Sequence, residues 1–237
     1  MDGKAAEAMP AKGKNADLPA RAVSALVMVA VAGLALWLGG IWLDLFIGAV
    51  VVATLAEFVL LVLKATRQQG ARFIGIAAGA IYIGLAGSAL IRFPSAMVIG
   101  IIGAVVFVDT FAYFFGRTLG GPKIAPAISP SKTWAGLLGG TVGAAIWLTG
   151  WLYVVSHAAV GSVGDWLDVY DMVQLLGMGA VVAVFAQAGD FFESWLKRRA
   201  GVKDSSQLIP GHGGVFDRTD GMIPVTLLAA AVFGAAL

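Results

Sequence analysis

Long apolar stretches separated by short polar segments dominate this chain of 237 residues. A hydrocarbon layer roughly 30 Å thick is crossed by about 20 apolar residues in a helix. The pattern predicts seven such helices, the last of them short, at about residues 22–39, 44–63, 72–91, 96–115, 134–155, 173–190 and 221–237. We therefore expect an all-α, polytopic integral membrane helix bundle with about seven transmembrane helices.

Composition supports this expectation and excludes several kinds of chemistry. The chain is 59% hydrophobic and 13% charged, whereas soluble domains are about 25% charged. It has no cysteine, which excludes disulfides, thiolate zinc sites and cysteine nucleophiles. Membrane orientation explains the basic residues better than nucleic-acid binding does, so we predict no nucleic-acid partner.

The N-terminal residues differ from the rest. Residues 1–20 are polar, small and interrupted by proline, which predicts a disordered cytosolic tail. The apolar run that follows is succeeded at once by a second long one, so we interpret it as a first transmembrane helix rather than a cleaved signal.

The distribution of Lys and Arg predicts the topology. With the N-terminus in the cytosol, 15 of the 16 Lys and Arg lie inside and only Arg92 lies outside. Cytosolic loops collect Lys and Arg, which favours this arrangement over its mirror image. The loop at 156–172 has three Asp and no Lys or Arg, and it fits the outer side.

Two loops on the cytosolic side are long for helix connections, which usually have about 2–8 residues and are often functional when longer. They cover residues 116–133 and 191–220. We therefore divide the chain into the tail at 1–20, N-terminal transmembrane helices at 21–100, and a region at 101–237 whose loops carry the chemistry.

The segment KDSSQLIPGHGGVFDRTD, residues 203–220, concentrates charged side chains between glycines. Its glycines let backbone amides approach a phosphate closely. Asp217 and Asp220 are three residues apart and are expected one turn apart on one helical face. Asp204 returns to them through a loop with a proline corner. Carboxylates beside a phosphate are typical Mg²⁺ ligands, so the segment predicts a metal site.

Other charged positions have two interpretations each. Asp190, Glu193 and Lys197 share one helical face. They could belong to the charged site, or they could be part of an ordinary juxtamembrane helix with a Glu193–Lys197 pair. In SPSKTW, residues 129–134, a turn at Pro130 and a helix start make a phosphate seat with Lys132, or a plain capping turn by Ser131 or Thr133.

Asp109 and Glu57 fall inside predicted spans. Ionisable groups there are costly and by default functional, or else they are structural partners of a buried Arg or Lys.

The stretch from residue 194 to 220 resembles the signature of the phosphatidate cytidylyltransferase family, also called CDP-diacylglycerol synthase. The matching positions are Ser194, Lys197, Arg198, Lys203, Asp204, Pro210, His212, Gly213, Gly214, Asp217, Arg218 and Asp220. SPSKTWAG and DTFAYFFGR are similar to two upstream motifs of that family. Ala135 departs from the pattern, because the family typically has Glu there.

The resemblance implies transfer of CMP from CTP to phosphatidic acid, with Mg²⁺ required and a second, monovalent cation left open. Implied catalytic residues are Lys132, Lys203, Asp204, Asp217, Arg218 and Asp220, and implied metal ligands are Asp204, Asp217 and Asp220. Implied substrate-binding residues are Ser129, Ser131, Lys132, Thr133, Ser194, Lys197, Arg198, His212, Gly213 and Gly214.

The expected setting is the bacterial inner membrane, with the active site facing the cytosol and a homodimer left open. Two alternatives stay open at this point, a CTP-dependent lipid kinase and an ion-coupled transporter. The transporter is disfavoured because the polar residues gather in loops rather than at mid-bilayer.

Overall fold

The computed structural model describes residues 18–160 and 169–234, and these form eight helices and one small hairpin. Six of the described helices are long and apolar enough to cross a membrane. They are α1 (Leu18–Leu38), α2 (Gly40–Ala65), α3 (Gln69–Arg92), α4 (Ser95–Thr118), α5 (Trp134–Val160) and α6 (Val169–Ala200). The predicted all-α, polytopic membrane bundle is confirmed.

The count of seven spans is not confirmed. The last predicted span, 221–237, contains the helix α8 (Met222–Phe233), which has 12 residues. At 1.5 Å per residue it is about 18 Å long, which is too short for a hydrocarbon layer of roughly 30 Å. A single-turn helix, α7 (Phe216–Thr219), precedes it.

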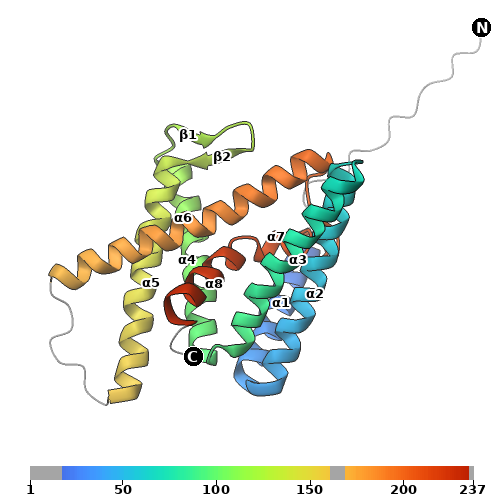
Figure 1. Cartoon of the computed structure of the whole chain (residues 1–237). Helices are drawn as coiled ribbons and strands as arrows, with labels where there is room; N and C mark the ends of the chain where they lie inside the picture. Colours follow the sequence, from blue (N-terminus) through green and yellow to red (C-terminus); the bar gives the residue numbers. More distant parts are fainter. Residues whose placement is uncertain (1–17, 161–168, 235–237) are drawn as a thin grey trace, which may run out of the picture.

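The long helices form two groups joined by α6 (Figure 1). Helices α1, α2 and α3 make one group, α4 and α5 make the other, and α6 runs obliquely across both while α8 lies between them. Glycines of α5 allow a close approach to α4, since a Cβ on Gly143 would stand 2.6 Å from the carbonyl oxygen of Phe107. Small residues are typical of such contacts in membrane bundles.

The two long loops lie at the same end of the bundle, which we call the loop rim. Helices α2, α4 and α6 end there, and α1, α3 and α5 begin there, whereas α8 begins deeper in the bundle, where Gly221 lies against Ala186 of α6 and Val105 of α4 (Figure 1). Arg92 ends α3 at the opposite end. This alternation matches the predicted distribution of Lys and Arg, and the side of the membrane that each end faces stays a prediction.

Several predicted loop boundaries are wrong. Helix α4 continues to Thr118 and α6 to Ala200, because their last turns keep helical hydrogen bonding past the apolar part of each span. The predicted outer loop at 156–172 is helical up to 160 and again from 169, and residues 161–168 lie outside the described residues.

The predicted tail is partly tested. Residues 1–17 lie outside the described residues, and residues 18–20 form the first turn of α1. The predicted disorder of those three residues is therefore wrong, because a proline such as Pro19 is well suited to the first turn of a helix, where its missing N–H would have had no intrahelical partner.

The loop at 116–133 contains a hairpin that the sequence did not suggest. Strand β1 (Lys123–Ala125) pairs antiparallel with β2 (Ser129–Thr133). The predicted turn at Pro130 is therefore wrong, since that residue lies within β2. The helix start is confirmed at Trp134, where the Thr133 hydroxyl oxygen accepts a hydrogen bond of 3.0 Å from the Gly136 amide. Thr133, rather than Ser131, caps α5.

Candidate active site

The connection from α6 to α7 contains the glycine-rich segment of the sequence. A tight turn closes it, because the Ile209 amide donates to the Gly213 carbonyl at 2.8 Å and the His212 amide donates to the Ile209 carbonyl at 2.9 Å. Gly211 and Gly213 have positive φ angles of 75° and 84°, a backbone conformation that glycine adopts without steric cost. The glycines therefore shape this loop directly.

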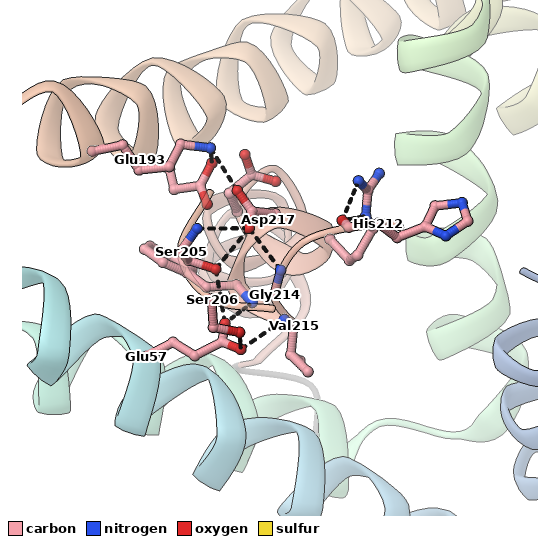
Figure 2. A network of polar contacts seen from close by, with 12 residues as sticks. Glu57, Glu193, Ser205, Ser206, His212, Gly214, Val215 and Asp217 are labelled. Atoms are coloured by element: carbon pink, nitrogen blue, oxygen red, sulfur yellow. Dashed lines mark hydrogen bonds and ion pairs between the residues drawn. The ribbon is translucent and has the colours of Figure 1, made fainter. Parts of the chain in front are cut away.

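Asp217 lies at the centre of a network that this loop forms with α6 (Figure 2). Its Oδ2 accepts hydrogen bonds from the Ser205 amide at 2.8 Å, the Ser205 hydroxyl at 2.7 Å and the Gly214 amide at 2.8 Å. Its Oδ1 pairs with Lys197 Nζ at 2.6 Å. Both carboxylate oxygens are thus engaged by donors.

These contacts fix the ionisation of Asp217. Burial acts to raise the pKa of its carboxyl group, but hydrogen bonds from Lys197 and the Gly214 amide outweigh burial and hold the pKa well below its usual range. Asp217 is therefore ionised throughout the physiological pH range.

Lys197 joins Asp217 to α6. Its Nζ lies 2.6 Å from Glu193 Oε2 and 2.6 Å from Asp217 Oδ1, which confirms the predicted Glu193–Lys197 pair. Glu193 is 2% exposed, and its other oxygen, Oε1, has no hydrogen-bond partner among the described residues. A buried carboxylate oxygen without a partner is costly unless a ligand or cation engages it.

A second charged group surrounds Lys132 in β2. Its ammonium forms an ion pair with Asp190 of α6. Burial lowers the pKa of Lys132, partly offset by the charges of Asp109 and Asp220. Burial also raises the pKa of Asp220, against the effect of Lys132 and Lys197. These opposite shifts mark a poorly hydrated site whose charges depend on one another.

Two cavities meet at Asp109 of α4. The first, of about 470 Å³, is the more polar of the two and is lined by Arg117, Lys123 and Lys132 together with Ser131 and Thr133. The second, of about 610 Å³, is lined by apolar side chains of α1, α2 and α4 and reaches Asp217, Arg218 and Asp220. Asp109 lines both, so a polar cavity and an apolar cavity converge on one carboxylate.

The structure brings together part of the predicted set of site residues. Lys132, Lys197, Gly214, Asp217 and Asp220 belong to the two charged groups just described. Ser131 and Thr133 line the polar cavity, and Ser129 is buried in β2.

The remaining predicted residues lie at the edge of the site. Lys203, Asp204 and Arg198 are exposed, and Ser194 is half-buried on α6. The His212 Nδ1 lies 2.8 Å from the Ser24 hydroxyl of α1, and its carbonyl accepts a hydrogen bond of 2.7 Å from Arg218. His212 thus joins the loop to α1. Gly213 sits against Asp217, since an added Cβ would stand 2.8 Å from Asp217 Oδ2.

The three predicted metal ligands do not form one cluster. No group of three or more His, Asp or Glu side chains within residues 18–160 and 169–234 is arranged to hold a metal ion. Asp217 and Asp220 do lie one helical turn apart, as the sequence predicted, because the backbone stays helical from Val215 to Gly221 and the Asp220 amide donates to the Phe216 carbonyl at 3.0 Å. The metal roles of Asp204, Asp217 and Asp220 stay predictions.

Some contributors were missed or left unassigned by sequence reasoning. Glu57 accepts hydrogen bonds from the loop, and within the described part of the chain it forms no ion pair with a buried Arg or Lys. Ser205 and Ser206, two of its donors, directly follow the Lys203–Asp204 pair, and only that adjacency marks them in the sequence. The sequence places Asp190 on a helical face with Glu193, but its ion-pair partner Lys132 lies 58 positions earlier in the chain.

Fold and site together define a class, namely a polytopic membrane protein with a cavity of about 470 Å³, lined by three cationic side chains, at one rim of its bundle. A family model described as "Cytidylyltransferase family" matches residues 91–236, more than half of the chain. The chain belongs to this cytidylyltransferase family.

Several curated relatives have the name phosphatidate cytidylyltransferase. The protein of Brucella melitensis is 46% identical over 127 residues, covering 54% of this chain and 42% of the relative. That of Rickettsia typhi is 40% identical over 127 residues, covering 54% and 52%. That of Haemophilus influenzae is 39% identical over 114 residues, covering 48% and 37%. The matched part thus spans about half or less of each relative's length.

Proposed function

We propose that this protein transfers CMP from CTP to phosphatidic acid, forming CDP-diacylglycerol and pyrophosphate for phospholipid synthesis. The observation that carries the proposal is the meeting of a cationic cavity and an apolar cavity at Asp109. A reaction between a triphosphate and a membrane lipid needs two such compartments side by side. The names of the relatives support the same reaction.

The polar cavity suits CTP. Arg117, Lys123 and Lys132 present three cations within about 470 Å³, and such cations stabilise the charge of a triphosphate. Lys132 is the innermost of them, because its ammonium pairs with Asp190 of α6. The predicted substrate contacts Ser131 and Thr133 line the same space.

The apolar cavity suits phosphatidic acid. Its walls include Val27 and Val31 of α1 and Val106 of α4, all on membrane-spanning helices. Its polar end has Arg218, whose guanidinium matches a phosphate in bidentate geometry. Acyl chains therefore lie among the spans while the phosphate reaches the aspartates.

The reaction needs no nucleophile from the protein. A phosphate oxygen of phosphatidic acid attacks the α-phosphorus of CTP in line, the bond from that phosphorus to the β-phosphate oxygen breaks, and pyrophosphate leaves with the electron pair. The chain's own contribution is orientation and stabilisation of negative charge. Lys132 and Arg218 hold the two phosphates, and Asp217 fixes the position of Lys197.

We also propose that Mg²⁺ binds here, with Asp220 and the unpartnered Glu193 Oε1 as oxygen donors. Magnesium would neutralise charge on the triphosphate. The other two predicted ligands are Asp204 and Asp217, and Asp217 joins only when its Oδ1 releases Lys197.

The loop rim is proposed to face the cytosol of a bacterium, in its inner membrane. The Lys and Arg distribution supports this orientation, and it gives the polar cavity access to cytosolic CTP.

The test uses purified protein in phosphatidate-containing detergent micelles with Mg²⁺ and CTP labelled at either the α- or the γ-phosphate. We expect label in the lipid from α-labelled CTP only, with release of pyrophosphate. Label from γ-labelled CTP would identify a lipid kinase instead, and no labelled lipid from either would overturn the proposal.

A further inference from the structure

We propose that Glu57 of α2 is a positioning residue that holds the glycine-rich loop, residues 204–216, in its working geometry. The inference rests on the proposed function, which supplies the reaction that the loop serves. Glu57 lies outside the matched residues 91–236, so the family match assigns it nothing.

Glu57 is a buried side chain, 4% exposed. Its Oε1 accepts hydrogen bonds from the Ser206 hydroxyl at 2.6 Å and the Val215 amide at 3.1 Å. Its Oε2 accepts from the Ser205 hydroxyl at 2.9 Å and the Phe216 amide at 2.7 Å. Figure 2 shows Glu57 reaching the loop from the side opposite Glu193. Four donors from the loop therefore converge on one carboxylate.

This arrangement requires that both side-chain oxygens of Glu57 act as hydrogen-bond acceptors. An ionised carboxylate has acceptor sites only, whereas an amide of the same shape places two N–H donors where one oxygen stood. On the side where the amide nitrogen lies, the serine hydroxyl can turn and accept, but the backbone amide would face a donor. The contact therefore favours Glu and would be weakened in Gln.

Ser205 connects Glu57 to Asp217. Its hydroxyl lies 2.9 Å from Glu57 Oε2 and 2.7 Å from Asp217 Oδ2, and it has one proton to donate. The two carboxylates thus share one donor, and the Ser205 amide adds a second bond to Asp217 at 2.8 Å. Displacement of Glu57 would shift Ser205. Asp217, which Ser205 contacts and which pairs with Lys197, would then shift as well.

Gly214 shows how closely this packing is adjusted. An added Cβ would stand 2.4 Å from Glu57 Oε2 and 2.1 Å from the Ser205 hydroxyl oxygen. The loop therefore rests on the Glu57 carboxylate with no space for a methyl group, while the Gly214 amide donates to Asp217 at 2.8 Å. The loop at Gly214 therefore contacts both acidic residues, Glu57 and Asp217.

The test compares Glu57→Gln and Glu57→Asp with Asp44→Asn as matched control. Asp44 is also an acidic residue of α2, about 20 Å along the helix axis from Glu57. Hydrogen–deuterium exchange of the loop amides is measured first, followed by kcat and KM for CTP and for phosphatidic acid, each per folded protein.

We expect faster exchange of the 205–216 amides in Glu57→Gln and a kcat lower by about 10- to 100-fold, as misplacement of reacting groups produces. Both KM values should stay within about twofold. Glu57→Asp, which keeps the charge but is one methylene shorter, should fall between Gln and wild type. Asp44→Asn should match wild type in both measurements.

Unchanged exchange in both Glu57 variants would overturn the inference, and so would faster exchange with an unchanged kcat. If Glu57→Gln yields no folded protein, Glu57→Asp decides by the same two criteria. A wild-type protein that labels no lipid would overturn the proposed function, whereas the exchange measurement would still decide whether Glu57 holds the loop.

Discussion

The charged residues of the loop rim form two groups that differ in how completely their polar atoms are paired. Around Asp217, both oxygens of Glu57 and of Asp217 have donors. Around Lys132, by contrast, Asp109 lines two cavities. Glu193 lies between the two groups, because Lys197 binds its Oε2, and its Oε1 has no partner among the described residues. We call these the anchored group and the cavity group.

The difference in pairing distinguishes a group with a structural role from a group that is suited to bind a ligand. Fully paired polar networks make a structure rigid, while partly paired ones mark places where a ligand completes the bonding. The anchored group therefore holds the loop in place, and the cavity group is where we propose that the substrates bind.

Replacement of Asp220 by Asn should have the largest effect on activity. Loss of the carboxylate beside Lys132 should lower CTP-dependent lipid labelling by at least about 100-fold, as for other electrostatic groups of active sites. Because burial raises the pKa of Asp220, its charge opposes folding at neutral pH, so the thermal midpoint should not fall. Near-normal labelling would remove Asp220 from the site.

Replacement of Asp217 by Asn should instead act mainly on stability. It breaks the Lys197 pair, in which the Asp217 side chain is 7% exposed, and removal of one partner of a buried pair costs about 3 kcal/mol. The pKa of Asp217 is lowered in the folded state, so its stabilisation is present at neutral pH and is lost as pH falls below the ordinary Asp range. Denaturation in micelles at pH 7 and at pH 3 measures this contribution.

A comparison of two alanines tests the packing under the loop. Gly214→Ala would bring a methyl group to 2.1 Å from the Ser205 hydroxyl oxygen, and we expect a loss of about 2 kcal/mol, as for overpacking. Gly84→Ala on α3 meets nothing within 4 Å and should be neutral or slightly stabilising. Equal stability of the two variants would contradict the close fit of the anchored group.

Lys132→Ala should raise the KM for CTP by about tenfold, which corresponds to about 1.4 kcal/mol of lost binding. Lys123→Ala, on an exposed strand residue of the same cavity, should have a smaller effect. Steady-state kinetics at saturating phosphatidic acid measure both, and unchanged values in Lys132→Ala would exclude this loop from the nucleotide site.

The pH profile should show the smallest effect. Burial lowers the pKa of Lys132, so kcat/KM should decline on the alkaline side at a lower pH than an ordinary lysine would give. Lys132→Arg, which stays protonated, should remove that decline even if its rate is lower. A decline at the same pH in both would assign it to another group.

Much of the bundle could be predicted because hydropathy reports membrane spans directly. The Glu193–Lys197 pair and the Thr133 cap also followed from local spacing. The hairpin at 123–133 could not, since Ser-Pro-Ser-Lys-Thr has no apolar alternation. The one-turn spacing of Asp217 and Asp220 could be predicted as well, because the backbone between them is helical.

Long-range pairing was equally hidden from the sequence. Glu57 and Ser205 are 148 positions apart, and nothing local in either segment indicates the other. The functional motif was therefore visible, whereas the residue that supports it from the N-terminal half needed the folded structure.

The most direct test of the two-cavity account is a cross-comparison of both KM values. Val106, on the wall of the apolar cavity, is 53% exposed, and Val184 of α6 is 50% exposed and does not line that cavity. We predict that Val106→Trp raises the KM for phosphatidic acid only, that Lys132→Ala raises the KM for CTP only, and that Val184→Trp changes neither. A rise in the CTP value alone for Val106→Trp, or no change in either value for both site variants, would contradict the account.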